Sequence, residues 1–492
     1  MIIVLILYSI ALLFIFAYSL TQATLIRRYL KHRNKRNVHA KDLDYLPNVT
    51  VQLPIYNELY VVNRLIDTIC QFNYPTEQLE IQVLDDSTDE TVDLIKSKVE
   101  EWREKGRNIV HVHRTNRIGY KAGALEAGLA QARGEYIAIF DSDFIPRLDF
   151  LLQTVPFFTD DKVGMVQTKW DHLNRNYSLL TKLQAFGLDA HFTVEQAGRN
   201  YNNGFINFNG TAGIWRKSCI IDSGNWQPDT LTEDLDLSYR AQLRDWKFIY
   251  LEDIESPAEL PPVMSALKTQ QYRWTKGGAE TAKKHLLNVL KSNKSASIKW
   301  HGLMHLLNSA LFLSILCCAV FSVPLLYVKQ AIPELKNAFL IASLFVFSFV
   351  ILYTLYYVSS AGRFHSKFSA FLNLLVTFPV FLSVSMGLSL HNGIAVLEGY
   401  MGKKTPFVRT PKFNLNNKQR NWASNKYLKA QLNWANVLEL LLAVYFVFGV
   451  VKGIQFRDYG LLPFHIMLSL GFLTVFYYSV FQSVLAKRNN QF

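Results

Sequence analysis

Two hydrophobic patterns divide the chain into regions of different kinds. Uncharged apolar runs occupy residues 1–26, 300–328, 338–362, 368–397 and 459–486, and one acid, Glu439, interrupts a further run at 430–451. Each run can hold the roughly 20 apolar residues that a membrane helix needs. Residues 49–295 instead mix charged and apolar positions, as water-soluble domains do. The pattern predicts a soluble domain between membrane anchors.

Within the soluble region, short β-branched runs alternate with segments of helical spacing. We expect strands at 49–53, 81–84, 109–113, 136–140 and 163–168, and helices at 59–70, 90–104 and 120–132. This alternation predicts an α/β fold in which helices flank a mostly parallel sheet. The ligand site of such a sheet lies beyond the carboxyl ends of its strands.

Positive charges predict how the chain crosses the membrane. The first apolar run has no basic segment before it and no cleavage site, and six Lys/Arg follow it within residues 27–36. We therefore expect an uncleaved anchor and a cytoplasmic domain at 49–295. The expected crossings are residues 2–22, 300–327, 338–358, 433–451 and 461–484.

Residues 368–390 are apolar enough to cross as well, but they contain Pro379 and precede a loop with eight Lys/Arg. A crossing there would place this loop outside, together with the tail that holds Lys487 and Arg488. We expect residues 368–390 to lie at the interface or to re-enter, which keeps both basic segments inside.

The composition excludes some broad classes of protein. With 492 residues, 50% hydrophobic and 18% charged, the chain is neither disordered nor fibrous. Its four cysteines give no sign of a disulfide framework. The net charge is +13, and the basic clusters lie beside the apolar runs. They favour contact with the lipid bilayer, including an amphipathic helix near 276–299, and they argue against a nucleic-acid partner.

Acidic residues follow two of the expected strands. Asp85 and Asp86 end the second strand, and Asp141 and Asp143 end the fourth. Four acids at one sheet edge repel one another unless a cation joins them, so the cluster favours a divalent metal. A turn or a helix cap is the alternative for an isolated Asp-x-Asp.

Two further motifs lie downstream. Thr232-Glu233-Asp234 precedes a helix expected at 235–243, so Asp234 lies at a helix start, where an acid could also serve only as a cap. Gln270 precedes Arg273-Trp274, which combines a fixed cation for a diphosphate with a flat face for a sugar ring. An interfacial tryptophan beside a snorkelling arginine is the alternative.

Four motifs together resemble the D, DxD, TED and QxxRW motifs of membrane-embedded family 2 glycosyltransferases. In chain order they are Asp85-Asp86, Asp141-x-Asp143, Thr232-Glu233-Asp234 and Gln270-x-x-Arg273-Trp274. The likeness spans Val49 to Lys283. Further stretches, 82–89, 119–125, 191–196 and 208–213, look like the cellulose-synthase-like A and C groups, which make β-1,4-linked mannan or glucan backbones. Residues 407–412 are similar to the F-x-V-T-x-K gating loop of cellulose synthases, although Arg409 and Pro411 depart from it.

The resemblance implies a GT-A (Rossmann-like) cytosolic domain with α-helical transmembrane segments on both sides. We expect the following division: an anchor at 1–26, a basic linker at 27–47, the catalytic domain at 48–275, an amphipathic interface helix at 276–299, and a membrane region at 300–492. The last region would include an interfacial segment at 362–397 and a gating-loop segment at 401–430.

The resemblance also implies roles for individual residues. Asp234 would be the general base with Glu233 beside it, Asp143 would bind Mg²⁺ or Mn²⁺, and Trp274 would hold the acceptor. The donor-binding residues would be Asp86, Asp141, Lys121, Gln270 and Arg273, and the gating loop would act through Phe407, Thr410 and Lys412.

Three functions follow as hypotheses. The first is an inverting transferase that moves a hexose from UDP-glucose or GDP-mannose to a growing β-linked, β-1,4 polysaccharide. The second is a glycolipid synthase that adds one β-hexose to ceramide or diacylglycerol. The third, a non-catalytic membrane scaffold, conflicts with the complete set of motifs. We expect a multi-pass protein of a bacterial inner membrane with its catalytic domain in the cytoplasm; oligomerisation or accessory subunits are compatible with either enzyme.

Overall fold

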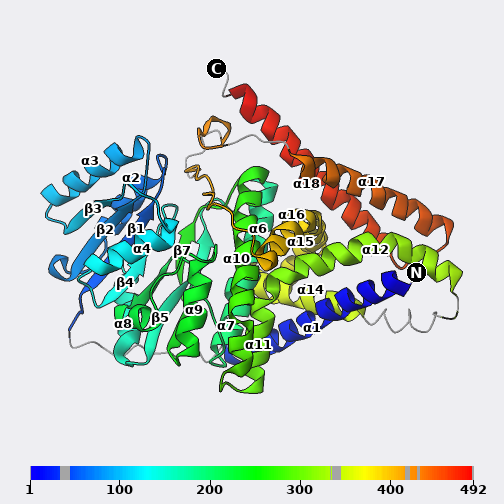
Figure 1. Cartoon of the computed structure of the whole chain (residues 1–492), viewed down its shortest axis with the longest axis horizontal. Helices are drawn as coiled ribbons and strands as arrows, with labels where there is room; N and C mark the ends of the chain where they lie inside the picture. Colours follow the sequence, from blue (N-terminus) through cyan, green and yellow to red (C-terminus); the bar gives the residue numbers. More distant parts are fainter. Residues whose placement is uncertain are drawn as a thin grey trace.

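The computed structural model of the protein describes residues 2–33, 45–332, 334, 345–415, 422–428 and 433–489. Figure 1 shows an α/β domain at one end, long helices at the other, and α10 (Met264–Lys291) between them. Parts of the predicted linker at 27–47, the crossing at 338–358 and the loop at 401–430 lie outside the described residues.

Seven strands form one sheet in the order β3-β2-β1-β4-β6-β5-β7. They are β1 (Val49–Ile55), β2 (Leu79–Asp85), β3 (Ile109–His113), β4 (Tyr136–Ile139), β5 (Val163–His172), β6 (Gly213–Arg216) and β7 (Lys247–Ala258). β6 is antiparallel to both neighbours, and all other pairs are parallel. The five predicted strands and the mostly parallel sheet are confirmed. The sequence reading missed β6, which has four residues, and β7, which carries several charges.

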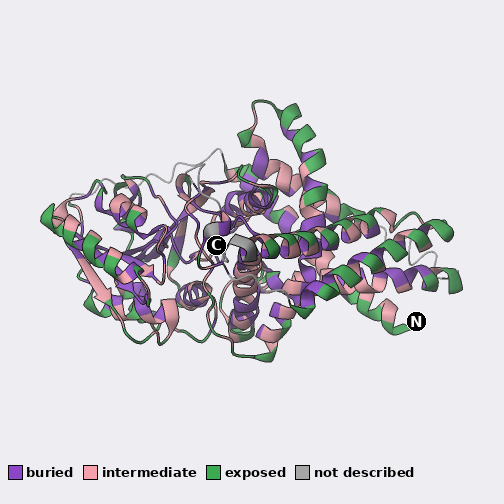
Figure 2. Cartoon of the chain, turned by 90° about the horizontal axis from the view of Figure 1, so that it is seen from above, coloured by how far each residue is buried: buried purple, intermediate pink, exposed green. Residues whose placement is uncertain are grey.

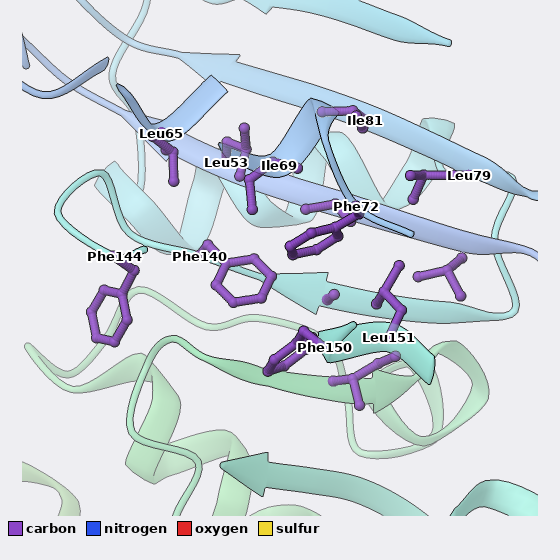
Figure 3. Packing of buried hydrophobic residues seen from close by; sticks show 14 of the residues in the cluster. Leu53, Leu65, Ile69, Phe72, Leu79, Ile81, Phe140, Phe144, Phe150 and Leu151 are labelled. Atoms are coloured by element: carbon purple, nitrogen blue, oxygen red, sulfur yellow. The ribbon is translucent and has the colours of Figure 1, made fainter. Parts of the chain in front are cut away.

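Helices cover both faces of the sheet. They are α2 (Val62–Cys70), α3 (Thr91–Glu104), α4 (Tyr120–Gln131), α5 (Phe150–Thr154), α6 (Leu179–Ala190), α7 (Gln196–Asn200), α8 (Lys217–Asp222) and α9 (Glu233–Leu243), with a π-helical turn at His191–Glu195. Leu65 and Ile69 of α2 pack with Leu53 and Phe140 in one core (Figure 3). Leu125 of α4 belongs to the core on the other face. Both faces are therefore buried, and the strand ends are held in place.

Among the described residues, five helical segments are long and apolar enough to cross a membrane: Ile2–His32, Asn308–Ala331, Lys367–Gly387, Trp434–Gln455 and Leu462–Ala486. The helices outside the domain are α1 (Ile2–His32), α11 (Ala296–Leu306), α12 (Leu311–Ala331), α14 (Val346–Ser360), α15 (Lys367–Gly387), α16 (Ser389–Met401), α17 (Trp434–Gln455) and α18 (Leu462–Asn489). Many exposed residues lie on the long helices (Figure 2), and large apolar ones such as Leu13 and Val444 are among them. Apolar side chains on the outside of helices suit a lipid environment.

Four of the five candidates overlap predicted crossings, and the fifth, at 367–387, covers the segment predicted to lie at the interface. Residues 300–306 belong to α11, and the candidate span begins only at Asn308. Residues 367–387 form one continuous helix that includes Pro379. Length and hydropathy do not distinguish a crossing from an interfacial helix, so the interfacial placement of 362–397 stays a prediction.

The predicted boundary between the catalytic domain at 48–275 and the interface helix at 276–299 falls inside α10, which is continuous. At this point Gly277 packs closely against Thr232, where an added Cβ would lie 2.6 Å from the Thr232 methyl carbon. Lys276, Ala279 and His285 are buried. The second half of α10 is thus packed on the domain on one side, while Leu287 and Leu290 are exposed.

Candidate active site

One pocket at the carboxyl end of the sheet gathers every predicted site residue. Its lining includes Lys121 at the start of α4, Asp86 after β2, Asp141 and Asp143 after β4, Glu233 and Asp234 of α9, Gln270, Arg273 and Trp274 of α10, and Phe407, Thr410 and Lys412 of the loop before α17. These residues come from positions separated by more than 300 residues, and the parallel strands bring the acids to one edge. Their individual roles stay predictions.

Asp141 is neutralised by a neighbouring cation. The Nζ atom of Lys121 lies 2.6 Å from its Oδ1 and donates a second hydrogen bond, 2.8 Å long, to the carbonyl oxygen of Gly210. Burial, the largest influence, would lower the pKa of Lys121, but the charges of Asp141, Glu233 and Asp234 and the hydrogen bond to Asp141 together outweigh it, and the pKa is raised. Lys121 therefore stays protonated and fixes the position of Asp141 at the pocket floor.

Asp143 is buried, and one of its oxygens is bound by the loop. Lys412 Nζ lies 2.7 Å from Oδ2, whereas Oδ1 is buried without a hydrogen-bond partner among the described residues. A buried carboxylate oxygen with no donor is costly unless a cation approaches it. Two carboxylates separated by one residue offer the hard oxygen ligands that Mg²⁺ and Mn²⁺ prefer. The residues present thus fit the predicted metal, with Lys412 on the oxygen that faces the loop.

A second group could also hold a metal ion. The ligand atoms of Asp85, His111 and His113 all lie within 4.8 Å of one another. Both imidazoles contact Asp85 Oδ2, at 2.8 and 3.2 Å, and the Ser87 amide donates to Oδ1. Burial alone would raise the pKa of Asp85, but these hydrogen bonds outweigh it and the pKa is lowered. This group is outside the pocket lining, so it is less suited than Asp141 and Asp143 to a metal that serves the pocket.

Glu233 and Asp234 form an acid pair at the first turn of α9. Burial, and next the charge of Glu233, raise the pKa of Asp234 to about 7, while Lys121 opposes the shift. Burial also raises the pKa of Glu233. Gly210, with φ +81, allows this arrangement, since an added Cβ would lie 2.9 Å from Asp234 Oδ2. Asp234 is therefore a group that can exchange a proton near neutral pH.

Arg273 connects α10 to the loop. Its Nη2 donates to Thr410 Oγ1 at 3.2 Å, and its guanidinium carbon lies 4.6 Å from the Phe407 ring centroid. Phe407 also stacks on Tyr120, which precedes Lys121. The three predicted loop residues thus contact α10, α4 and Asp143, so that the loop covers the pocket.

Arg409, the departure from the gating-loop pattern, has a partner on the domain. Its guanidinium forms an ion pair with Glu58, with an N to O distance of 2.6 Å, and lies over the Tyr427 ring. Asn414 extends this attachment, because its backbone N–H donates to Glu259 Oε2. The arginine therefore anchors the loop to the residues that follow β1.

Asp86 lines the pocket but is already paired. Arg114 contacts both of its carboxylate oxygens, from Nε at 2.7 Å and from Nη2 at 2.6 Å. Such a bidentate pair holds the carboxylate in one orientation. The predicted contact of Asp86 with a nucleoside would use the lone pairs of its carboxylate oxygens that Arg114 leaves free.

Sequence reasoning missed several lining residues, among them Tyr56, Glu58, Arg117, Trp170 and Glu259. Glu58 lies three residues after β1, so the rule that identified the acids after β2 and β4 could have found it, whereas Glu259 comes directly after β7, a strand that the sequence pattern missed. Trp170 lies inside β5, and no pattern separates it from a core aromatic residue.

Comparison with known proteins agrees with this geometry. Residues 47–277 match the model of the family described as "Glycosyltransferase like family 2". The probable glucomannan 4-beta-mannosyltransferase 4 of Oryza sativa subsp. japonica is 44% identical over 271 residues, which are 54% of this chain and 49% of the relative. The glucomannan 4-beta-mannosyltransferase 2 of Arabidopsis thaliana is 43% identical over 253 residues, 50% of this chain and 47% of the relative. The chain thus spans about half the length of the curated relatives it matches.

A solved structure confirms the fold. The mannosyltransferase PcManGT from Pyrobaculum calidifontis, in complex with GDP-Man and Mn²⁺, superimposes with a TM-score of 0.55 at 19% identity and covers 81% of this chain and 100% of its own. The predicted GT-A fold is therefore present, and the motif order correctly indicated the family. Residues 47–277 form a glycosyltransferase family 2 domain.

Proposed function

We propose that the protein is an inverting hexosyltransferase that extends a β-linked polysaccharide at a membrane from a nucleotide-sugar donor. The observation that carries this proposal is the convergence of Asp141 and Asp143, Glu233 and Asp234, and Arg273 and Trp274 on one pocket. The pocket combines groups for a diphosphate, a proton and a sugar ring. A non-catalytic scaffold would need none of these together.

The proton-transfer step is assigned to Asp234. An acceptor hydroxyl would attack the anomeric carbon of the donor while its proton passes to the Asp234 carboxylate. The bond from the anomeric carbon to the diphosphate breaks, and its electron pair leaves with the diphosphate. Attack from the opposite side converts an α-linked donor into a β-glycoside. A carboxyl group with a pKa of about 7 is matched to this task at neutral pH.

The diphosphate would lie between the Asp141 and Asp143 pair and the cations Arg273 and Lys412. Asp143 and Asp141 would hold Mg²⁺ or Mn²⁺, which supplies neutralisation of the charge that develops on the departing group. Arg273 adds a fixed cation, because Thr410 and Phe407 hold its guanidinium in place. The Mn²⁺ in the PcManGT complex supports this assignment and leaves the choice between the two ions to experiment.

GDP-mannose is the favoured donor and a β-1,4-linked mannan or glucomannan backbone the favoured product. The support is the 44% and 43% identity to proteins named as glucomannan 4-beta-mannosyltransferases. UDP-glucose is the second donor to test. The same relatives favour the polysaccharide over the single-sugar glycolipid. A bacterial inner membrane and a cytoplasmic catalytic domain stay predictions.

The acceptor would lie at the aromatic end of the pocket. Trp170, Trp274 and Leu188 are among the lining residues, and α10, which carries Trp274, lies between the domain and the long helices (Figure 1). Aromatic faces suit the apolar face of a sugar ring. A growing glycan held at this boundary would be close to the candidate membrane helices.

The test uses the full-length chain in detergent or lipid nanodiscs with GDP-[¹⁴C]mannose or UDP-[¹⁴C]glucose, Mn²⁺ or Mg²⁺, and a manno-oligosaccharide primer. We expect labelled high-molecular-weight product that an endo-β-mannanase degrades and that is lost in Asp234→Asn. A chloroform-soluble monoglycoside would instead favour the glycolipid synthase. Equal product from the wild type and Asp234→Asn would contradict the proposal.

A further inference from the structure

Arg117 has an environment that the mechanism does not use. It lies in the loop between β3 and α4 and lines the pocket with Tyr56, Asp86 and Lys121. Its guanidinium carbon lies 3.3 Å from the Tyr56 ring centroid and 5.0 Å from that of Tyr120. The guanidinium therefore lies over the face of one aromatic ring and is held there before any ligand binds.

The polar edge of this guanidinium lacks a partner. Its Nε is buried without an acceptor, and among the described residues no hydrogen bond or ion pair engages the rest of the group. The other two arginines of the pocket lining contact Thr410 and Glu58. Burial lowers the pKa of Arg117, which reflects the cost of a poorly solvated charge. A partly buried cation without an acceptor indicates a site that a ligand completes.

The place of Arg117 along the pocket indicates which part of a donor it would meet. In the sheet, β1 and β2 lie on one side of β4, and β6 lies on the other. Tyr56 and Asp86 follow β1 and β2. Gly210, which approaches Asp234, precedes β6. With the diphosphate near Asp141 and Asp143, the sugar would point toward Asp234 and the nucleobase would point toward Tyr56 and Arg117.

We propose that Arg117 reads the nucleobase of the donor and selects guanine over uracil. This inference rests on the proposed function. A guanidinium fork presents two parallel N–H donors, and guanine offers two adjacent acceptors, O6 and N7, on one edge. Uracil offers only O4 on the corresponding edge. The Asp86 carboxylate, held by Arg114, would accept from an N–H group of the base, so that Arg117 supplies the discrimination.

The experiment measures equilibrium binding of GDP, UDP and inorganic pyrophosphate to the full-length chain in detergent with Mn²⁺. The variants are Arg117→Lys, which keeps the charge but removes the fork, and Arg133→Lys, a matched control whose side chain is 83% exposed. We expect wild-type protein to prefer GDP to UDP. Arg117→Lys should weaken GDP binding about 5- to 150-fold, the range of one bidentate base contact. UDP and pyrophosphate binding should change by less than about threefold, which also verifies that the variant is folded.

Other outcomes overturn the inference in distinguishable ways. Equal weakening of GDP, UDP and pyrophosphate would assign Arg117 to the diphosphate, and unchanged GDP binding would deny it any contact with the donor. A wild-type preference for UDP would contradict guanine selection and leave the hexosyltransferase proposal standing. Binding of neither nucleotide would overturn the proposed function together with this inference.

Discussion

Two acid pairs share the pocket, and their surroundings differ. Asp141 and Asp143 each contact a lysine, at 2.6 and 2.7 Å. Among the described residues, no lysine or arginine forms an ion pair with the carboxylate of Glu233 or with that of Asp234. Burial raises the pKa of both acids. A carboxylate beside a lysine offers its remaining oxygen to a metal ion, whereas a buried acid with a raised pKa is prepared to hold a proton. The same residue type thus has two tasks, and the environment decides between them.

The largest effect is expected at the proton-transfer pair. Asp234→Asn removes the only carboxylate assigned to the acceptor proton, so kcat should fall about 10²- to 10⁴-fold. Affinity for GDP should change little, because the donor contacts lie on the other pair. Steady-state kinetics and nucleotide binding measure the two quantities. Asp245→Asn, at an exposed acid paired with Lys294, is the control. If Asp234→Asn also lost GDP binding, the two acid pairs would not have separate functions.

Asp143→Asn tests the metal assignment of the other pair. A metal ion beside a leaving group contributes several kcal/mol, and about 1.4 kcal/mol is a factor of ten. We therefore expect at least about 100-fold loss of kcat/KM and a higher Mn²⁺ concentration for half-maximal activity. Titration of activity against Mn²⁺ measures both. An unchanged Mn²⁺ dependence would contradict a metal site at Asp143 and would favour Asp85, His111 and His113 as the metal ligands.

Lys412→Met probes the loop cation on Asp143. Without this ammonium, both oxygens of Asp143 are open to a metal, so the donor-free protein should bind Mn²⁺ about tenfold more tightly, in line with a hydrogen bond to a charged group. Calorimetry on the full-length chain measures the affinity. Lys426→Met is the matched control, since Lys426 lies on the same loop and contacts Asp89 and Glu90 instead. Equal affinities in the two variants would contradict competition at Asp143.

The smallest effect concerns the pH dependence. A general base must be deprotonated, so activity should rise with pH through about 7 and fall away below it. Burial raises the pKa of Asp234 most, the charge of Glu233 adds to it, and Lys121 opposes it. Glu233→Gln removes the second contribution and should move the half-maximal pH of kcat/KM below that of the wild type. A pH profile with the same midpoint in both proteins would exclude coupling within the pair.

The sequence predicted the strands and the acids after them because both depend on local patterns. Val49–Ile55 and Leu79–Asp85 have apolar residues at most alternate positions, and a strand end is the point where this pattern stops. The pattern failed for β6, which is too short, and for β7, which carries charges. It also placed a boundary inside α10, because close packing at Gly277 is not visible in the order of residues.

The short motifs predicted the family that residues 47–277 match, and the hydrophobic pattern predicted the α/β class and several membrane-length helices, since each depends on residue types at short spacing. Only the tertiary structure decided that Lys412 meets Asp143, that Arg409 meets Glu58, and that Arg117 lies on Tyr56 without an acceptor. It also decided which acids are paired with cations and which have a raised pKa. These properties depend on burial and on charges contributed by residues far away in the sequence, and they exist only once the sheet, α10 and the loop are packed together.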